Sequence, residues 1–124
     1  MPVIDDVSRL QHILEAAQKA VGYTKNRKRA DLDTDELLVL GLIRLLEIIG
    51  EAAWGISEDL RRKYPEIAWR QMSGMRNRLI HGYFDVNNDL VWETVTLELP
   101  PLITRIKAVI KKEVVKKGKI IKPP

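Results

Sequence analysis

The chain has 124 residues, of which 45% are hydrophobic and 31% are charged, and it contains no cysteine. This length and apolar content allow one domain with a single core and leave no room for a second. The lack of cysteine excludes a disulfide framework, a thiolate metal site and a cysteine nucleophile, and it is compatible with a reducing compartment.

The first six residues carry neither the basic segment nor the continuous apolar run of a secretory signal. The most apolar stretch, residues 37–54, is interrupted by Arg44, Glu47 and Glu51. These charges are expensive in lipid but ordinary in a helix of a soluble bundle. We therefore expect a cytoplasmic protein without a membrane span.

The net charge of +4 is unevenly distributed, because the segment from Arg105 to Lys122 has eight basic residues and only one acid, Glu113. A basic tail suits a polyanion such as RNA, since each neutralised phosphate releases counterions. A solvated, frayed helix end would have the same composition, so the lysines alone do not decide between the two. We divide the chain into a helical domain, residues 1–112, and a basic tail, residues 113–124.

Two long amphipathic patterns occupy the first half of the chain. Apolar residues at spacings of three and four predict a first helix that ends near Gly22: Val3, Val7, Leu10, Leu14, Ala17 and Val21. A basic loop, residues 23–30, follows. Asp33, with Glu36 three positions later, then predicts the N-terminus of a second helix that runs to about Trp54.

The second helix has apolar residues on more than one face, so it must be buried from several sides, in the core or at a subunit interface. Glu47 and Glu51 lie one turn apart on it. They could form a carboxylate site, or they could accept hydrogen bonds from basic groups on a neighbouring element.

In the second half, a short helix beginning at Ser57 should stop at Tyr64-Pro65, because proline disfavours helix in the preceding residue. We expect another helix over residues 67–80, with Gly82 as its C-cap. A last helix, capped within residues 87–89, keeps its period across Pro100-Pro101, where a kink is expected. The fold class is therefore all-α, a four-helix up-and-down bundle.

Few residues are suited to catalysis. There are two histidines and no Glu-x-x-His pair, which excludes a di-iron carboxylate site, and no P-loop or dinucleotide fingerprint occurs. His12 lies off the apolar stripe of the first helix and is expected at the surface. The segment from Arg76 to Tyr83 remains.

Arg76 and His81 are five positions apart, which places their side chains about 140° apart around a regular helix. A single copy of the chain could therefore not direct both side chains at the same substrate atom. Two copies related by a two-fold axis could line one shared cleft with both pairs. Such a cleft suits RNA cleavage without a metal. Histidine can exchange the proton of a ribose 2′-hydroxyl or leaving oxygen, while arginine stabilises phosphate charge.

The sequence Arg76-Asn77-Arg78-Leu79-Ile80-His81-Gly82-Tyr83 resembles the Arg-x4-His-x-Tyr motif of the HepT-like branch of the HEPN superfamily. The resemblance extends over most of the chain, through residues 47–53, 65–69 and 83–86, Trp92 and Leu99-Pro100. It implies a homodimer of four-helix bundles and a metal-independent endoribonuclease that needs no cofactor. Many such proteins are toxins of prokaryotic type VII toxin–antitoxin pairs.

On this resemblance Arg76 and His81 are the catalytic residues, and Asn77 and Arg78 bind the RNA. Tyr83 corresponds to the tyrosine that a minimal nucleotidyltransferase antitoxin can block by AMP transfer. The added negative charge should repel RNA from a site that binds phosphate.

Two other functions use the same bundle without catalysis. It could be an accessory subunit that binds a nucleotidyltransferase or RNA, or an adaptor dimer that uses residues 37–54 as a partner groove. Intact Arg76, His81 and Tyr83 favour the enzyme, since an adaptor would not need them.

Overall fold

The computed structural model describes residues 5–81 and 85–121, and of His81 and residues 116–121 it describes the backbone only. These residues are mostly helical, as the all-α prediction requires. The elements in chain order are α1 (Asp6–Thr24), α2 (Asp31–Thr34), α3 (Glu36–Trp54), α4 (Glu58–Lys63), α5 (Trp69–Ser73), α6 (Met75–Leu79), β1 (Ile80–His81), β2 (Asp85–Val86), α7 (Asn88–Glu93), the π-helical turn η1 (Thr94–Glu98) and α8 (Leu99–Ile121).

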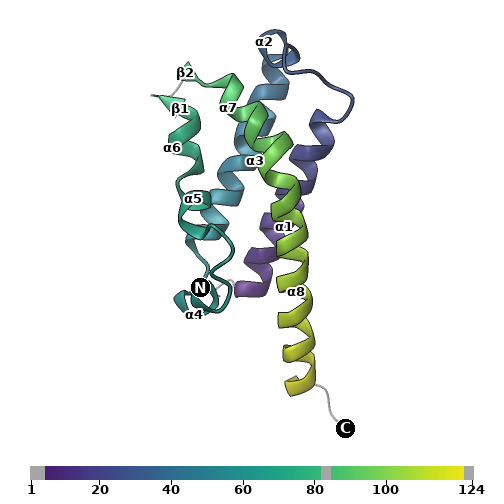
Figure 1. Cartoon of the computed structure of the whole chain (residues 1–124), viewed down its shortest axis with the longest axis vertical. Helices are drawn as coiled ribbons and strands as arrows, with labels where there is room; N and C mark the ends of the chain where they lie inside the picture. Colours follow the sequence, from purple (N-terminus) through teal and green to yellow (C-terminus); the bar gives the residue numbers. More distant parts are fainter. Residues whose placement is uncertain (1–4, 82–84, 122–124) are drawn as a thin grey trace.

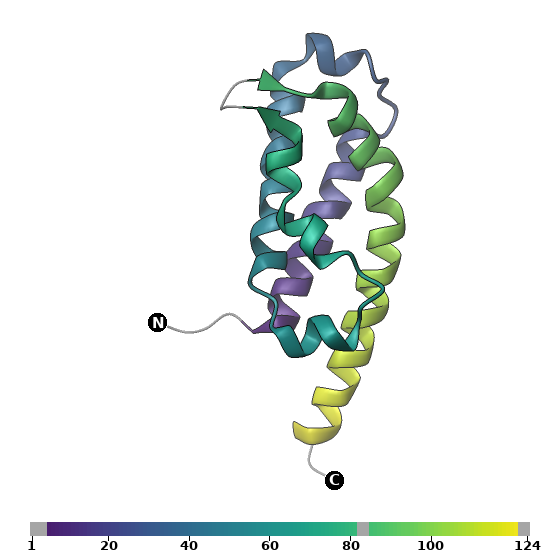
Figure 2. The same cartoon turned by 60° about the vertical axis from the view of Figure 1, so that its left-hand side comes forward.

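The long helices α1, α3 and α8 run along the long axis of the molecule, and α1 packs against both of the others (Figure 1). The α5–α6 segment lies beside α3 in both views (Figure 2). Between them is a core whose fully buried members include Leu10, Ile13, Leu42, Leu46, Ile49, Leu79, Leu99 and Ile106. Among the described residues, none of the helices combines the length and the hydropathy that a membrane span requires.

Side-chain caps begin several helices, and two of these caps lie where the sequence predicts them. Ser57 accepts a hydrogen bond from the Leu60 N–H at 3.2 Å, and Asn87 accepts one from the Leu90 N–H at 3.1 Å. The predicted cap of α3, Asp33, is wrong: Asp35 caps this helix by accepting from the Leu38 N–H at 3.1 Å. Asp33 lies within α2, and its carboxylate binds Arg29 instead.

The helix predicted over residues 67–80 is broken and ends early. It stops at Ser73, resumes after Gly74 and ends at Leu79, and Ile80 is extended with φ −127° and ψ 125°. The Leu79 carbonyl accepts from the Asn87 N–H at 2.8 Å, and β1 pairs antiparallel with β2. The C-cap of α6 is Ile80, and the predicted cap Gly82 lies outside the described residues. Because this pairing replaces the last helical turn, the 140° angle of a regular helix does not separate Arg76 from His81.

The final helical run passes through the proline pair without ending, as predicted. Pro100 and Pro101 have no N–H to donate. Immediately before them the chain forms η1, in which the Leu99 N–H bonds to the Thr94 carbonyl, five residues back. The hydroxyl of Thr96 donates to the Trp92 carbonyl at 2.7 Å.

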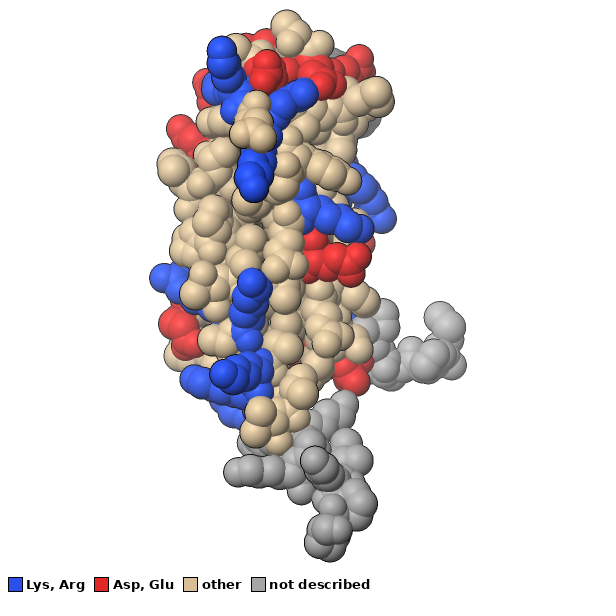
Figure 3. Space-filling view, turned by 90° about the vertical axis from the view of Figure 1, so that its right-hand side faces the viewer, with Lys and Arg blue, Asp and Glu red and all other residues tan. Residues whose placement is uncertain are grey.

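The helix α8 extends through the start of the proposed tail without a break. Glu113 accepts hydrogen bonds from the Tyr64 hydroxyl at 2.5 Å and from Lys63 Nζ at 2.8 Å. Burial, and then the bond to Glu113, raise the pKa of Tyr64. Glu113 therefore ties α8 to the end of α4. Figure 3 shows basic side chains following one another down this side of the molecule, toward the C-terminal end.

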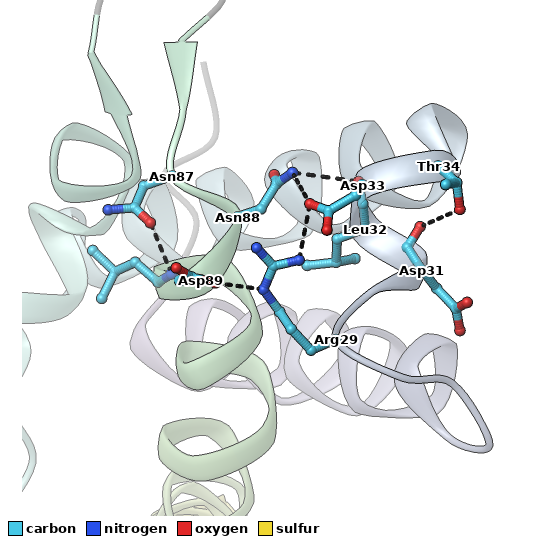
Figure 4. Close-up of polar contacts among 9 residues, drawn as sticks. Arg29, Asp31, Leu32, Asp33, Thr34, Asn87, Asn88 and Asp89 are labelled. Atoms are coloured by element: carbon cyan, nitrogen blue, oxygen red, sulfur yellow. Dashed lines mark hydrogen bonds and ion pairs between the residues drawn. The ribbon is translucent and has the colours of Figure 1, made fainter.

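A polar network joins α2 to the start of α7, directly after the β1–β2 pair (Figure 4). Arg29 donates to Asp89 at 2.6 Å and to Asp33 at 3.0 Å, and the Asn88 side-chain amide donates to the Leu32 carbonyl at 3.3 Å. The bond from Arg29 lowers the pKa of Asp33. The network holds the start of α7 against α2, and so helps to position the β1–β2 pair that directly precedes it.

Candidate active site

The close approach of α5 to α3 builds the candidate site. A Cβ on Gly50 would lie 3.0 Å from the Met72 carbonyl oxygen, closer than side chains normally come to a backbone. Met72, Met75 and Leu79 are buried against the core, so the intervening residues of α6 face outward. Glycine at position 50 thus lets the α5–α6 segment pack closely against the C-terminal half of α3.

Arg76 meets Glu47 at this contact. Its Nε lies 3.0 Å from the Glu47 Oε2, with the arginine side chain 50% exposed and the glutamate 25% exposed. Glu51 is near Arg44 instead, at 3.9 Å along the same helix. Of the two roles open to these acids, contact with a basic group on a neighbouring element is the one that Glu47 adopts. No group of three potential metal ligands occurs among the described residues.

A surface hollow of about 290 Å³ surrounds this ion pair. The residues on its α3 side are Glu47, Gly50, Glu51 and Trp54, and those on its other side are Ser73, Arg76 and Asn77. Asn77 is exposed, and the two predicted site residues Arg76 and Asn77 therefore share one concave surface. An arginine in such a hollow offers a charged donor to an anion such as phosphate.

Arg78, the other predicted RNA-binding residue, lines a different groove. That groove has a volume of about 260 Å³ and lies between the α5–α6 segment and the η1–α8 segment. Arg78 there approaches Glu98, with 3.8 Å between its NH2 and the glutamate Oε1. Arg78 and Asn77 are adjacent in the sequence, but they line different hollows of the surface.

The backbone of His81 is in β1, two residues beyond the end of α6, and its register partner is Asp85. The strand therefore begins directly after the helix that carries Arg76. The side chain of His81 and all of Tyr83 lie outside the described residues. His12, which the sequence places at the surface, is exposed.

Comparison with known proteins identifies the family. The family described as Ribonuclease HepT-like matches residues 13–109. The chain belongs to this family. It is 41% identical to a Thermococcus cleftensis protein named "Probable ribonuclease HepT", over 75% of this chain and 84% of that one.

Two further relatives of this HepT-like chain are named, provisionally, as RNases. One, from Caldanaerobacter subterraneus, is 36% identical over 84% of this chain and 93% of its own length. The other, from Methanocaldococcus jannaschii, is 37% identical over 90% of this chain and 92% of its own. No solved structure matches the chain.

Some residues of the hollow were not predicted as site residues. Trp54, which is 74% exposed, and Ser73, at the end of α5, both line the hollow. The only signal in the sequence is that Trp54 follows Glu47 and Glu51 at helical spacing. Nothing in the sequence indicates that Ser73 shares a surface with these α3 residues, because their proximity depends on how α5 packs.

Proposed function

We propose that this HepT-like chain is a metal-independent endoribonuclease and the toxin of a type VII toxin–antitoxin pair. One observation carries the proposal: an arginine, Arg76, is held by a carboxylate in a surface hollow, and the strand bearing His81 begins directly after its helix. Family membership and the names of the relatives support ribonuclease activity in general.

The proposed chemistry uses the ribose as the nucleophile. A histidine accepts the proton of the 2′-hydroxyl while the 2′-oxygen attacks the adjacent phosphorus, and the bond from phosphorus to the 5′-oxygen breaks. A histidine in its protonated form returns a proton to that leaving oxygen. The guanidinium of Arg76 stabilises the negative charge that develops on the phosphate. No metal is required for any of these steps.

The proposed antitoxin is a minimal nucleotidyltransferase that transfers AMP to the hydroxyl of Tyr83. Tyr83 is two residues beyond His81 in the sequence, so the added phosphate would lie near the proposed site. Its charge would then oppose the binding of an RNA phosphate.

We further propose that the active form is a homodimer formed across α3. Leu37, Leu40 and Trp54 are 82%, 54% and 74% exposed. They lie on one stripe of the helix, together with the acids of the hollow. A second copy on this stripe would bring the two hollows together, because a two-fold interface repeats each patch.

Cleavage of total RNA by the purified chain, in the presence of a chelator, tests the proposal. Arg76→Ala and His81→Ala should each lower the rate by about a hundredfold or more, since each removes charge stabilisation or proton transfer. Helicity and oligomeric state should stay the same. Arg70→Ala is the matched control, because Arg70 is also exposed on this segment but does not line the hollow.

If His81→Ala cleaves RNA at the wild-type rate, the catalytic assignment is wrong. The accessory-subunit function would then take its place, in which the bundle only binds a nucleotidyltransferase or RNA. Loss of cleavage on adding the chelator would contradict metal independence.

A further inference from the structure

The ion pair between Arg76 and Glu47 divides the guanidinium into two edges. A guanidinium has five N–H donors, one on Nε and four on the terminal nitrogens. The structure gives the contact to Glu47 through Nε, at 3.0 Å from Oε2. The contact is an ion pair, in which the carboxylate is the more buried partner and the arginine side chain is half exposed.

We infer that Glu47 is a positioning residue, which holds Arg76 by its Nε edge so that the terminal nitrogens are directed to an RNA phosphate in the hollow. This inference rests on the proposed function and assigns a role in it to a residue outside the Arg-x4-His-x-Tyr motif. Glu47 does not touch the substrate. It acts through Arg76.

The packing of the backbone makes the contact specific to Glu47. Gly50 lies three residues after Glu47 on α3, and its lack of a side chain lets the Met72 carbonyl come close. Arg76 lies four residues after Met72, at the start of α6, so the same close approach brings its side chain to Glu47. Glu51 lines the hollow too, but its ion pair is with Arg44 and spans 3.9 Å on an exposed surface.

Because Glu47 is negatively charged, a positioning role and a role in RNA binding predict different effects of its removal. A carboxylate beside a phosphate site repels the substrate, so removing it should leave RNA affinity unchanged or raise it. Removing it should at the same time free the guanidinium to adopt other rotamers. A displacement of about 1 Å at a reacting group can lower the rate by about a hundredfold. Positioning therefore predicts a loss in kcat without a rise in KM.

The experiment measures kcat and KM of RNA cleavage for Glu47→Ala, Glu47→Gln and the wild-type chain. Glu47→Ala should lower kcat by about a hundredfold and leave KM equal or lower. Glu47→Gln keeps the shape of the side chain but removes its charge, so it should recover only part of the loss. In the Arg76→Ala background, Glu47→Ala should have no further effect, because the residue on which Glu47 acts is gone.

The control is Glu58→Ala, which removes an Arg–Glu ion pair of 3.2 Å between Glu58 and Arg62, outside the hollow. It should leave kcat and KM unchanged. A readout independent of activity is the Nε–H signal of Arg76 in the nuclear magnetic resonance spectrum, assigned by its loss in Arg76→Ala. In Glu47→Ala the chemical shift of this signal should change, because the carboxylate charge beside Nε is gone, and in Glu58→Ala it should not.

Three outcomes would overturn the inference and leave the proposed function intact. They are a wild-type kcat in Glu47→Ala, a loss of activity that appears only as a raised KM, and an Arg76 signal that does not change in Glu47→Ala. Wild-type cleavage by Arg76→Ala would overturn both. Circular dichroism of each variant shows whether it is folded, and Glu47→Gln, which keeps the shape of the side chain, serves if Glu47→Ala does not fold.

Discussion

Arginine has a property at position 76 that lysine lacks. Its planar guanidinium has donors on separate edges, so one edge can bind Glu47 while another binds a phosphate. A lysine has a single nitrogen on a flexible stem, and that nitrogen would have to serve both partners. The proposed role of Arg76, bound to Glu47 and to a phosphate at once, therefore depends on the shape of its side chain as much as on its charge.

Under the proposed function, Tyr83 is the residue whose modification would stop RNA cleavage. We predict that Tyr83→Phe, coexpressed with a nucleotidyltransferase antitoxin, stays toxic, because the hydroxyl that accepts AMP is missing. The measurement is growth of cells that carry both genes, with AMP transfer followed by the mass of the purified chain. The wild-type chain should gain the mass of one AMP, and the variant none.

Tyr23→Phe is the matched control, since Tyr23 is an exposed tyrosine on α1. It should be modified and neutralised like the wild type. Neutralisation of Tyr83→Phe by the antitoxin, together with an added AMP, would place the modification on another residue.

Among the elements, α8 combines a structural part and a basic part. Ile106 and Val109 are buried in the core, and Glu113 bonds to Tyr64 and Lys63 at the far end of the same helix. Arg105, Lys107, Lys111 and Lys112 are exposed. The lysines beyond Val115 can therefore be removed without touching these contacts, which makes their contribution measurable on its own.

We predict that a chain truncated after Val115 folds normally but binds RNA less tightly, with a weaker dependence on salt. The truncation removes Lys116, Lys117, Lys119 and Lys122. On single-stranded RNA, the slope of log K against log salt should fall by about 0.7 for each phosphate that the truncated chain no longer binds. The measurement is RNA binding over a series of salt concentrations, with circular dichroism as the test of folding.

Removal of Pro123 and Pro124 alone is the control, because it shortens the chain without changing the number of basic side chains. An unchanged salt slope after the larger truncation would show that these lysines do not contact RNA.

For the whole molecule, the main feature is that three large apolar side chains of α3 stay exposed in the single chain, on a stripe that also carries Arg44, Glu47 and Glu51. On α3, Leu42, Leu46 and Ile49 are buried in the core, while Leu37, Leu40 and Trp54 are exposed on the outside. This division accounts for the apolar residues that the sequence places on more than one face of this helix. Because these side chains share one exposed face of a helix, they are candidates for an interface.

We predict that the wild-type chain sediments as a dimer at micromolar concentration and that Leu40→Glu weakens the dimer by roughly a hundredfold or more, because an unpaired buried charge costs several kcal/mol. Analytical ultracentrifugation measures both. Leu97→Glu is the control, since Leu97 is 70% exposed but lies in η1, away from α3. A monomeric wild-type chain, or equal weakening by the control, would contradict an α3 interface.

Features that depend on short stretches of chain could be predicted from the sequence. The helical periods, the caps Ser57 and Asn87, and the continuation of the last helix across Pro100 follow from neighbours within one or two turns. The resemblance of residues 76–83 to the HepT-like motif is also local, and family membership confirms it.

The tertiary structure alone decided how the segments of the site meet. Glu47 rather than Glu51 reaches Arg76, because α5 packs against α3 at Gly50. The helix bearing Arg76 ends at Leu79, because the Leu79 carbonyl is bound by the N–H of Asn87. These outcomes depend on contacts between residues distant in the chain, and the helical period of one segment carries no information about the residue that approaches it from another.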